Sequence, residues 1–142
     1  MLTAFDVAEY ILEKKGAMTT MKLQKLVYYS QAWALVWDEE PLFDEKIEAW
    51  ANGPVIRKLF ESHKGQYTVS TVGGDSGRLN QVNRETVDAV LDHYGDKSAQ
   101  WLIELTHLED PWIQARKGLK PFEQSNQEIT LGSMAEYYSS LL

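Results

Sequence analysis

Residues 21–57, MKLQKLVYYSQAWALVWDEEPLFDEKIEAWANGPVIR, contain three different local patterns in direct succession. Within residues 26–37 only Ser30 and Gln31 are clearly polar, whereas a surface helix carries its apolar residues along a single stripe. A helix that is apolar on nearly every side needs cover from other elements on nearly every side. This stretch therefore predicts a fold built around a central, buried helix.

The two ends and the two faces of this central helix can be assigned from the sequence. Thr19 or Thr20 can cap its start, and Pro41 ends the run. The opposite face is expected to carry Tyr29, Trp33 and Val36. The inner face is expected to carry Leu23, Leu26, Val27, Ser30, Ala34 and Trp37, and all of these except Ser30 are predicted to build the core.

An acidic turn follows the central helix. Only Lys46 offsets its acidic residues, which are Asp38, Glu39, Glu40, Asp44, Glu45 and Glu48. Residues 42–43 and 47–51 have the length of small extended pieces, so we predict a two-stranded ribbon at most. Asn52, Gly53 and Pro54 then predict the start of a new helix, because proline is tolerated in the first helical turn.

The same signals predict the remaining helices. They are expected at residues 4–15 after Thr3, from Pro54 to about His63, from a cap at Asn83 to Gly95, from Asp96 or Ser98 to Leu108, at residues 111–117, and from about Leu131 onward. The sum is a mainly α, compact single domain spanning residues 1–142. It is expected to have about six or seven helices around the central buried helix, with a small β ribbon.

Composition narrows the classes of function. The 142 residues include no cysteine, which removes thiol catalysis and disulfides, and the net charge of −7 disfavours nucleic acid or an anionic membrane as a partner. No apolar run approaches the roughly 20 residues that cross a bilayer, and the start lacks a basic leader with a cleavage site. We therefore expect a cytoplasmic protein without a membrane partner, and the oligomeric state stays open.

Three surface features could bind a partner. The acidic turn is either a solvated turn or a docking surface for a basic protein, because complementary charge speeds association. Trp50 alternates with Ile47, Ala49 and Ala51, so its ring can face away from them as an interface anchor, although a core position is the milder interpretation. A basic patch for nucleic acid is the alternative surface, from Lys22, Lys25, Arg57, Lys58 and Lys64.

A single cluster of residues is a candidate for catalysis. His107, Glu109 and Asp110 place an imidazole and two carboxylates at a helix junction, where they could perform acid-base work or simply cap the helix. No metal-binding spacing of histidines, nucleophile elbow or phosphate-binding loop is present. We therefore expect no cofactor, no metal and no enzymatic activity.

The chain resembles a known family at several separate segments. The matching residues are Lys22 to Tyr29, Trp33, Pro41 to Phe43, Glu48 to Trp50 and Gly53 to Val55, followed by Leu105 to His107 and Pro111 with Trp112. Together they are similar to the signatures of the Panacea domain, which includes SocA-like antitoxins and phage-associated GepA-like proteins. The glycine-rich loop at residues 73–77 lies outside these signatures.

The resemblance implies a non-enzymatic antitoxin of a bacterial or prophage toxin-antitoxin system that neutralises its toxin by direct protein binding. The implied partner is a toxin encoded by an adjacent gene. Other interpretations are a proteolytic adaptor that delivers the toxin to the ClpXP protease, a promoter-binding autoregulator, or an acid-base enzyme using His107. The candidate toxin-binding residues are Glu39, Glu40, Asp44, Glu48, Trp50, His107 and Trp112.

Overall fold

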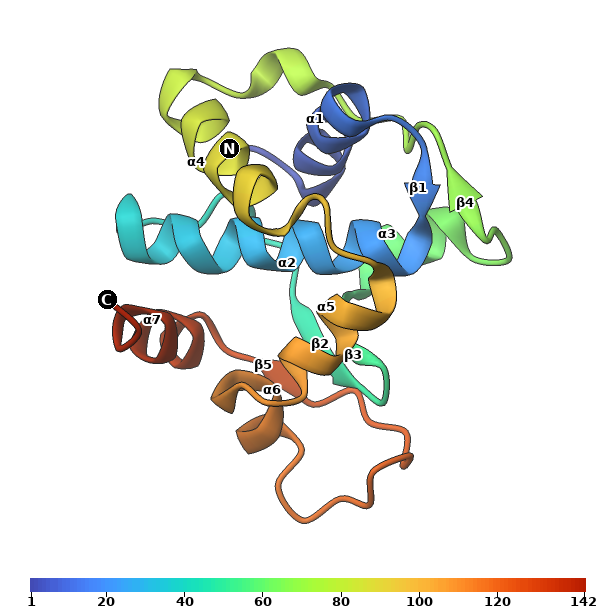
Figure 1. The fold of residues 1–142 in the computed structure, drawn as a ribbon, viewed down its shortest axis with the longest axis vertical. Coiled ribbons are helices and arrows are strands. Elements are labelled where there is room, and N and C mark those ends of the chain that lie inside the picture. Colours follow the sequence, from blue (N-terminus) through green and yellow to red (C-terminus); the bar gives the residue numbers. More distant parts are fainter.

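The computed structural model describes residues 1–142 and places one helix, α2 (Thr20–Trp37), through the middle of the molecule (Figure 1). Helices α1 (Ala4–Lys15), α4 (Gln81–Tyr94), α5 (Ala99–Thr106) and α7 (Leu131–Ser139) all pack against it. Helix α3 (Arg57–His63), helix α6 (Asp110–Ala115) and the short 3-10 helix η1 (Ser76–Arg78) complete the helical elements. The prediction of a mainly helical fold around a buried central helix is confirmed.

The core lies on both faces of α2. Leu23, Leu26, Val27 and Ala34 are fully buried, as predicted. Tyr29, assigned to the opposite face, is equally buried because it stacks on Tyr94 of α4 with ring centroids 4.2 Å apart. None of the helices is both long enough and apolar enough to span a bilayer.

The predicted core position of Trp37 is wrong. Its side chain is 46% exposed, at the last residue of α2. Trp33, one turn earlier, occupies the space above the core, where it packs on Tyr138 and donates its indole N–H to the Tyr94 hydroxyl at 3.0 Å. The Trp37 ring stacks on the outer side of Trp33 at 5.0 Å and therefore faces solvent.

The β structure is larger than predicted. Strand β2 (Ile47–Trp50) pairs antiparallel with β3 (Gly53–Ile56) on one side and with β5 (Glu128–Ile129) on the other. A second sheet joins β1 (Met18–Thr19) to β4 (Thr68–Val69). Residues 67–72 were expected to be extended, and β4 lies within them, but the prediction of one two-stranded ribbon missed β5, β1 and the pairing of β1 with β4. Two-residue strands show no alternation and arise only from pairing with a distant segment.

The predicted helix start at Pro54 is also wrong, because residues 53–56 form strand β3 and α3 begins at Arg57. The outer edge of β3 is satisfied by side chains from α2. The Gln24 amide donates to the Ile56 carbonyl at 3.3 Å and accepts from the Ile56 N–H at 2.8 Å. The Lys25 ammonium donates to the Pro54 carbonyl at 3.1 Å. Proline fits this edge position because it has no N–H to leave unpaired.

Gln31 pairs in the same way with the backbone groups of a second extended segment, residues 42–43. Its Nε2 donates to the Phe43 carbonyl at 2.8 Å and its Oε1 accepts from the Leu42 N–H at 2.7 Å. Gln24 and Gln31 are two helical turns apart and so lie on the same face of α2. This face holds two segments to the central helix, namely residues 42–43 within the acidic turn and Ile56 after it.

Helix boundaries follow local caps. Thr3 forms the predicted cap of α1 as a full capping box with Asp6, and Thr19 rather than Thr20 caps α2. Asn80 caps α4, which corrects the predicted cap at Asn83. Asn83 is instead the third residue of the helix, and its side-chain oxygen accepts a hydrogen bond from the Asn80 N–H, so both asparagines belong to one capping box. The last helix begins at Leu131, as predicted.

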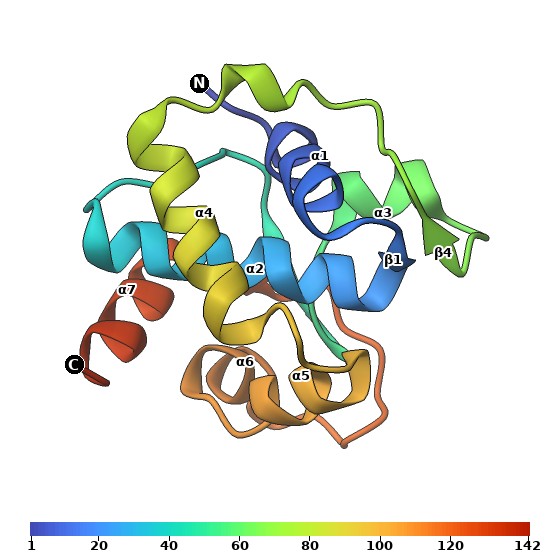
Figure 2. The same cartoon turned by 45° about the horizontal axis from the view of Figure 1, so that its top comes forward.

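Three carboxylates of α1 hold the glycine-rich loop, which runs along that helix in Figure 2. Glu9 accepts hydrogen bonds from the N–H groups of Val72 and Gly74, and Asp6 accepts one from the Asp75 N–H at 2.9 Å. A side chain at Gly74 would overlap the Phe5 carbonyl, with a Cβ only 2.0 Å from its oxygen. The close approach of two backbones therefore requires glycine at this position.

Candidate functional site

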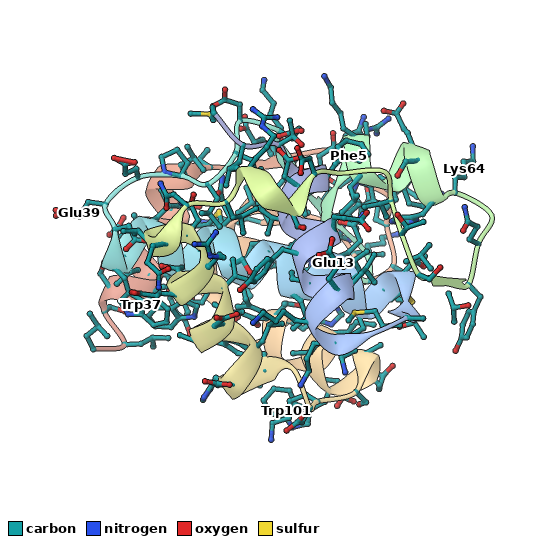
Figure 3. The ribbon with its side chains drawn as sticks, turned by 90° about the horizontal axis from the view of Figure 1, so that it is seen from above. Phe5, Glu13, Trp37, Glu39, Lys64 and Trp101 are labelled. Atoms are coloured by element: carbon teal, nitrogen blue, oxygen red, sulfur yellow. The ribbon has the colours of Figure 1, made fainter.

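The candidate residues form two groups at different places along α2. Glu39, Glu40 and Asp44 lie in the loop after its C-terminus, whereas Trp50 lines a hollow together with Thr20 near its N-terminus. An 18-residue helix is about 27 Å long, which is the scale of the separation. In Figure 3, Trp37 and Glu39 appear at one side of the molecule and Lys64, at the end of α3, at the other.

Glu48, Trp50 and Arg57 make one cluster on the outer face of the β2–β3 hairpin. The Arg57 Nε donates to both oxygens of Glu48 at 3.1 Å, and the Trp50 indole N–H donates to Glu48 at 2.8 Å. The Trp50 ring packs edge-on against Phe60 at 4.8 Å and is half-buried. The carboxylate of Glu48 is thus neutralised within the chain and has little charge left for a partner.

His107 and Trp112 stack on each other next to this hairpin. Their rings lie 4.0 Å apart and nearly parallel, and the Trp112 indole N–H donates to the Trp50 carbonyl at 2.8 Å. Burial chiefly lowers the pKa of His107, and the charges of Lys25 and Arg116 add to that effect. The Nε2 atom of His107 is buried and has no hydrogen-bond partner in the chain. These rings connect α5 and α6 to the hairpin.

The predicted acid-base cluster is not assembled. Glu109 turns inward, where the hydroxyls of Tyr29 and Tyr138 donate to its Oε1 at 2.7 and 2.8 Å. Asp110 is exposed in the first turn of α6, and His107 stacks on Trp112 instead of facing either carboxylate. None of the three residues lines the hollow beside Trp50 or the hollow beside Val82. No group of three or more His, Asp or Glu side chains is placed to hold a metal ion.

Two of the five residues in the predicted basic patch are not available to bind nucleic acid. Lys25 is only 1% exposed and therefore cannot meet a phosphate backbone at the surface. Arg57 is exposed, but its charge is paired with Glu48. Lys22, Lys58 and Lys64 remain, which is a small basic surface on a chain with a net charge of −7.

The acidic end, which we define as Trp37, Glu39, Glu40 and Asp44, is open to solvent. All four side chains are exposed, and none of the three carboxylates forms an ion pair within the chain. Glu39 has a left-handed φ of 57°. This is the backbone conformation that usually follows a helix C-terminus and that glycine adopts without strain.

The neighbouring acidic residues have structural roles instead. Asp38 accepts a hydrogen bond from the Thr86 hydroxyl of α4 at 2.6 Å, and Glu45 accepts one from the Ala4 N–H at the start of α1. The acidic turn therefore consists of anchored carboxylates and free carboxylates. Burial and hydrogen-bond partners distinguish the anchored carboxylates from the free ones. The sequence alone does not distinguish them.

Beside the acidic end is a hollow of about 330 Å³. Asp38 and Glu40 line it on the side of the acidic turn, and Val82 lines it on the side of α4, where the side chain is 53% exposed. The remaining walls come from Pro41, Leu42, Asn80 and Asn83. A mixed lining in which Leu42 and Val82 lie among polar and acidic residues suits an aliphatic stem that ends in a positive charge.

A larger hollow of about 530 Å³ lies at the opposite end of α2, and we call it the hairpin pocket. Gln24 and Lys25 of α2 line it, together with Trp50 and Asn52 of the hairpin. Phe60 and His63 of α3 and the loop Gln124, Ser125 and Asn126 complete the walls. From the sequence, Lys25 was assigned to a basic surface patch and to the family signature, and this pocket was not predicted.

The earlier and the later signature residues meet at the turn of the β2–β3 hairpin. A Cβ at Gly53 would lie 2.6 Å from Lys25 Cε and 2.9 Å from the Thr106 hydroxyl oxygen, so the three residues are in close contact. The indole of Trp112 is bonded to Trp50 in the same region. Residues from three separate parts of the chain thus converge on one turn.

Comparison with known proteins identifies the class. Residues 23–113 match the family described as antitoxin SocA-like, Panacea domain, and the chain belongs to this family. It is similar to Antitoxin SocA of Caulobacter vibrioides (strain NA1000 / CB15N), with 28% identity over 124 residues. The similarity covers 75% of this chain and 66% of that relative, so the chain spans about two thirds of the relative's length. No solved structure matches the chain.

Proposed function

We propose that this protein is an antitoxin that neutralises its toxin by binding it directly, and that the acidic end is the contact surface. One observation carries the proposal: the half-exposed Trp37 ring, stacked on Trp33, is followed in the chain by three exposed carboxylates that form no ion pairs. A rigid aromatic ring gains much buried area for a small loss of entropy, and such rings dominate the binding energy of protein interfaces.

The charge of this surface specifies the partner's chemistry. A basic toxin would be attracted over several ångströms by Glu39, Glu40 and Asp44, and the net charge of −7 adds to that attraction. The neighbouring hollow accommodates a lysine or arginine side chain, with its stem against Val82 and its charge at Glu40. The family supports a toxin as the partner, because it is named for the antitoxin SocA.

Co-expression tests the function itself. The product of the adjacent gene should arrest growth when it is expressed alone, and co-expression of this protein should restore growth. A neighbour that is harmless alone, or that stays toxic in the presence of this protein, contradicts the proposal. Rescue that requires ClpXP, and disappears in cells without that protease, identifies a proteolytic adaptor instead of a direct inhibitor.

Charge reversal tests the surface. Changing Glu39, Glu40 and Asp44 together to lysine should weaken toxin binding by more than tenfold at low ionic strength and should flatten the dependence of affinity on salt. The matched control reverses three exposed glutamates elsewhere, namely Glu61, Glu128 and Glu136, and leaves affinity within about threefold. Equal losses in both triple variants mean that net charge alone attracts the toxin, and no loss in the first variant excludes the acidic end.

A gel-shift experiment addresses the promoter-binding alternative. Because Lys25 is buried and Arg57 is paired with Glu48, we expect no complex with promoter DNA even at low salt. A complex that is lost when Lys22, Lys58 and Lys64 are changed to alanine would assign a second function to the remaining basic surface.

A further inference from the structure

The hairpin pocket has a charge opposite to that of the chain. Its lining contains the cations Lys25 and Arg57 and not a single aspartate or glutamate, although acidic residues outnumber basic ones by 21 to 14 in the whole sequence. The Arg57 charge is already neutralised by Glu48, which lies outside the pocket lining. One positive charge, that of Lys25, is therefore left without a counter-ion.

Lys25 has unused hydrogen-bonding capacity. An ammonium group has three donors, and the only hydrogen bond of Lys25 within the chain is the one to the Pro54 carbonyl. The side chain is 1% exposed, so its donors are enclosed by the protein and by the pocket that it lines. A buried ammonium without an anion is unfavourable, and this burial lowers the pKa of Lys25 to about 7.

The walls of the pocket are suited to a flat apolar body. Trp50 and Phe60 present two aromatic side chains to it, and Val55 adds an aliphatic contact. Asn52 and the loop residues Gln124 and Asn126 add polar groups to the lining. The volume of about 530 Å³ is in the range of small-molecule sites, which combine apolar walls with a few placed polar groups.

We infer that the hairpin pocket is a binding site for a small monocarboxylic acid with a flat, apolar body, whose carboxylate pairs with the ammonium of Lys25. A carboxylate matches the single free charge, whereas a phosphate ester carries more negative charge than this pocket can balance. The site lies at the other end of α2 from the acidic end, so the inference is independent of the proposed toxin contact.

Binding of model acids tests the inference. Indole-3-acetate and 3-phenylpropanoate should shift the NMR signal of the Trp50 indole N–H, and the corresponding primary amides, which have the same shape without the charge, should bind at least tenfold more weakly. Equal affinity for acids and amides overturns the inference. So does a result in which only a peptide with a free C-terminal carboxylate binds, because the occupant would then be the end of a protein chain.

Two variants assign the effect to Lys25. Lys25→Met keeps the apolar stem and removes the charge, so it should abolish the preference for the acid over its amide. Lys58→Met removes a neighbouring exposed charge that does not line the pocket and should retain the preference. An unchanged preference in the folded Lys25→Met protein overturns the inference.

The pH dependence of binding to the wild-type protein tests the role of the Lys25 charge without any variant. The affinity for the acid should fall by more than tenfold between pH 7 and pH 9 as Lys25 loses its proton, while the affinity for the amide should stay constant. The titratable neighbours are His63 of α3 and His107 at the end of α5. Burial chiefly lowers the pKa of both, so they are uncharged throughout this range. An acid affinity that does not change with pH contradicts the inference.

Discussion

Gln24 pairs with both backbone groups of Ile56, donating to its carbonyl at 3.3 Å and accepting from its N–H at 2.8 Å. Both residues are buried, and the amide takes the place that a neighbouring strand would have at the edge of β3. A buried backbone group without a partner costs about as much as its lost hydration. The pairing therefore connects the central helix to the sheet that carries the hairpin.

Gln24→Leu should lower the free energy of unfolding by about 2–4 kcal/mol, because two buried backbone groups would lose their partner at once. Urea unfolding at pH 7 measures the change. Gln100→Leu, on the exposed face of α5, is the matched control and should stay within about 0.5 kcal/mol of the wild type. Similar small changes in both variants would show that Ile56 finds other partners.

Glu109 should make stability depend on pH. Burial raises the pKa of Glu109 above its usual 4.5 and outweighs the hydrogen bonds from Tyr29 and Tyr138, which lower it. The folded state therefore binds the proton more tightly than the unfolded state. The resulting stabilisation is fully present below the unfolded pKa and is lost as the pH rises through the folded pKa.

Glu109→Gln cannot ionise, so it isolates this contribution. The stability of the wild type minus that of Glu109→Gln should fall by up to about 1.4 kcal/mol per pH unit above pH 4.5, until the folded pKa is passed. Urea unfolding of both proteins from pH 4 to pH 8 measures the difference. A difference that rises with pH would mean that the tyrosine hydroxyls, and not burial, dominate the pKa of this carboxyl.

Asp6 should have the opposite dependence. Burial alone would raise its pKa, but hydrogen bonds from the N–H groups of Asp75 and Thr3, together with the Arg78 charge, lower it overall. Its stabilisation is present above the unfolded pKa of about 3.8 and is lost as the pH falls through the folded pKa.

Asp6→Asn should cost about 1–2 kcal/mol at pH 7, and the cost should shrink as the pH falls below 4. The control is Glu13→Gln on the same helix, which removes a carboxylate that contacts only the exposed Ser76 hydroxyl. We expect this control to change stability by less than about 0.5 kcal/mol. A cost for Asp6→Asn that does not shrink at all between pH 5 and pH 2 would assign the effect to side-chain shape and not to charge.

Glu39→Gly should raise the stability of the protein and at the same time weaken its binding to the toxin. Glycine adopts the left-handed φ of 57° without strain, so the free energy of unfolding should rise by about 1 kcal/mol. Loss of a free carboxylate should at the same time weaken toxin binding. Glu40→Gly is the control without a left-handed φ and should not stabilise the protein. Destabilisation by both glycines would show that the turn relaxes around Glu39.

Trp37→Ala should weaken toxin binding by at least tenfold while lowering stability by less than about 1.5 kcal/mol, because the ring is half-exposed and packs mainly on Trp33. Isothermal titration calorimetry with the purified toxin measures the affinity. Trp101→Ala removes a similarly exposed ring from α5, outside the acidic end, and should bind normally. Normal binding by Trp37→Ala would remove this ring from the interface.

The sequence predicted most helix starts and stops because these signals are local. Thr3, Thr19 and Ser98 cap the helices that follow them, and Gly95 closes α4. The wrong prediction of a helix start at Pro54 has a physical cause. A proline after glycine is equally compatible with a helix start and with an edge strand, and only Gln24 and Lys25, some 30 residues earlier, decide between the two.

The candidate site was only partly predictable for the same reason. A run of acidic residues indicates a charged turn, but which carboxylates stay free depends on Thr86 and Ala4, which lie far away in the chain. Trp37 continues the apolar pattern of α2, so periodicity placed it in the core. Its exposure results from Trp33 covering the core one turn earlier.

By itself the sequence determined a central helix, the order of helices around it and membership of the antitoxin family, because capping, periodicity and signature residues are properties of short segments. The tertiary structure decided which polar residues of α2 became buried partners, which aromatic ring remained outside, and that Lys25 faces a pocket. These outcomes depend on what packs against each side chain from distant parts of the chain, and no local pattern encodes that packing.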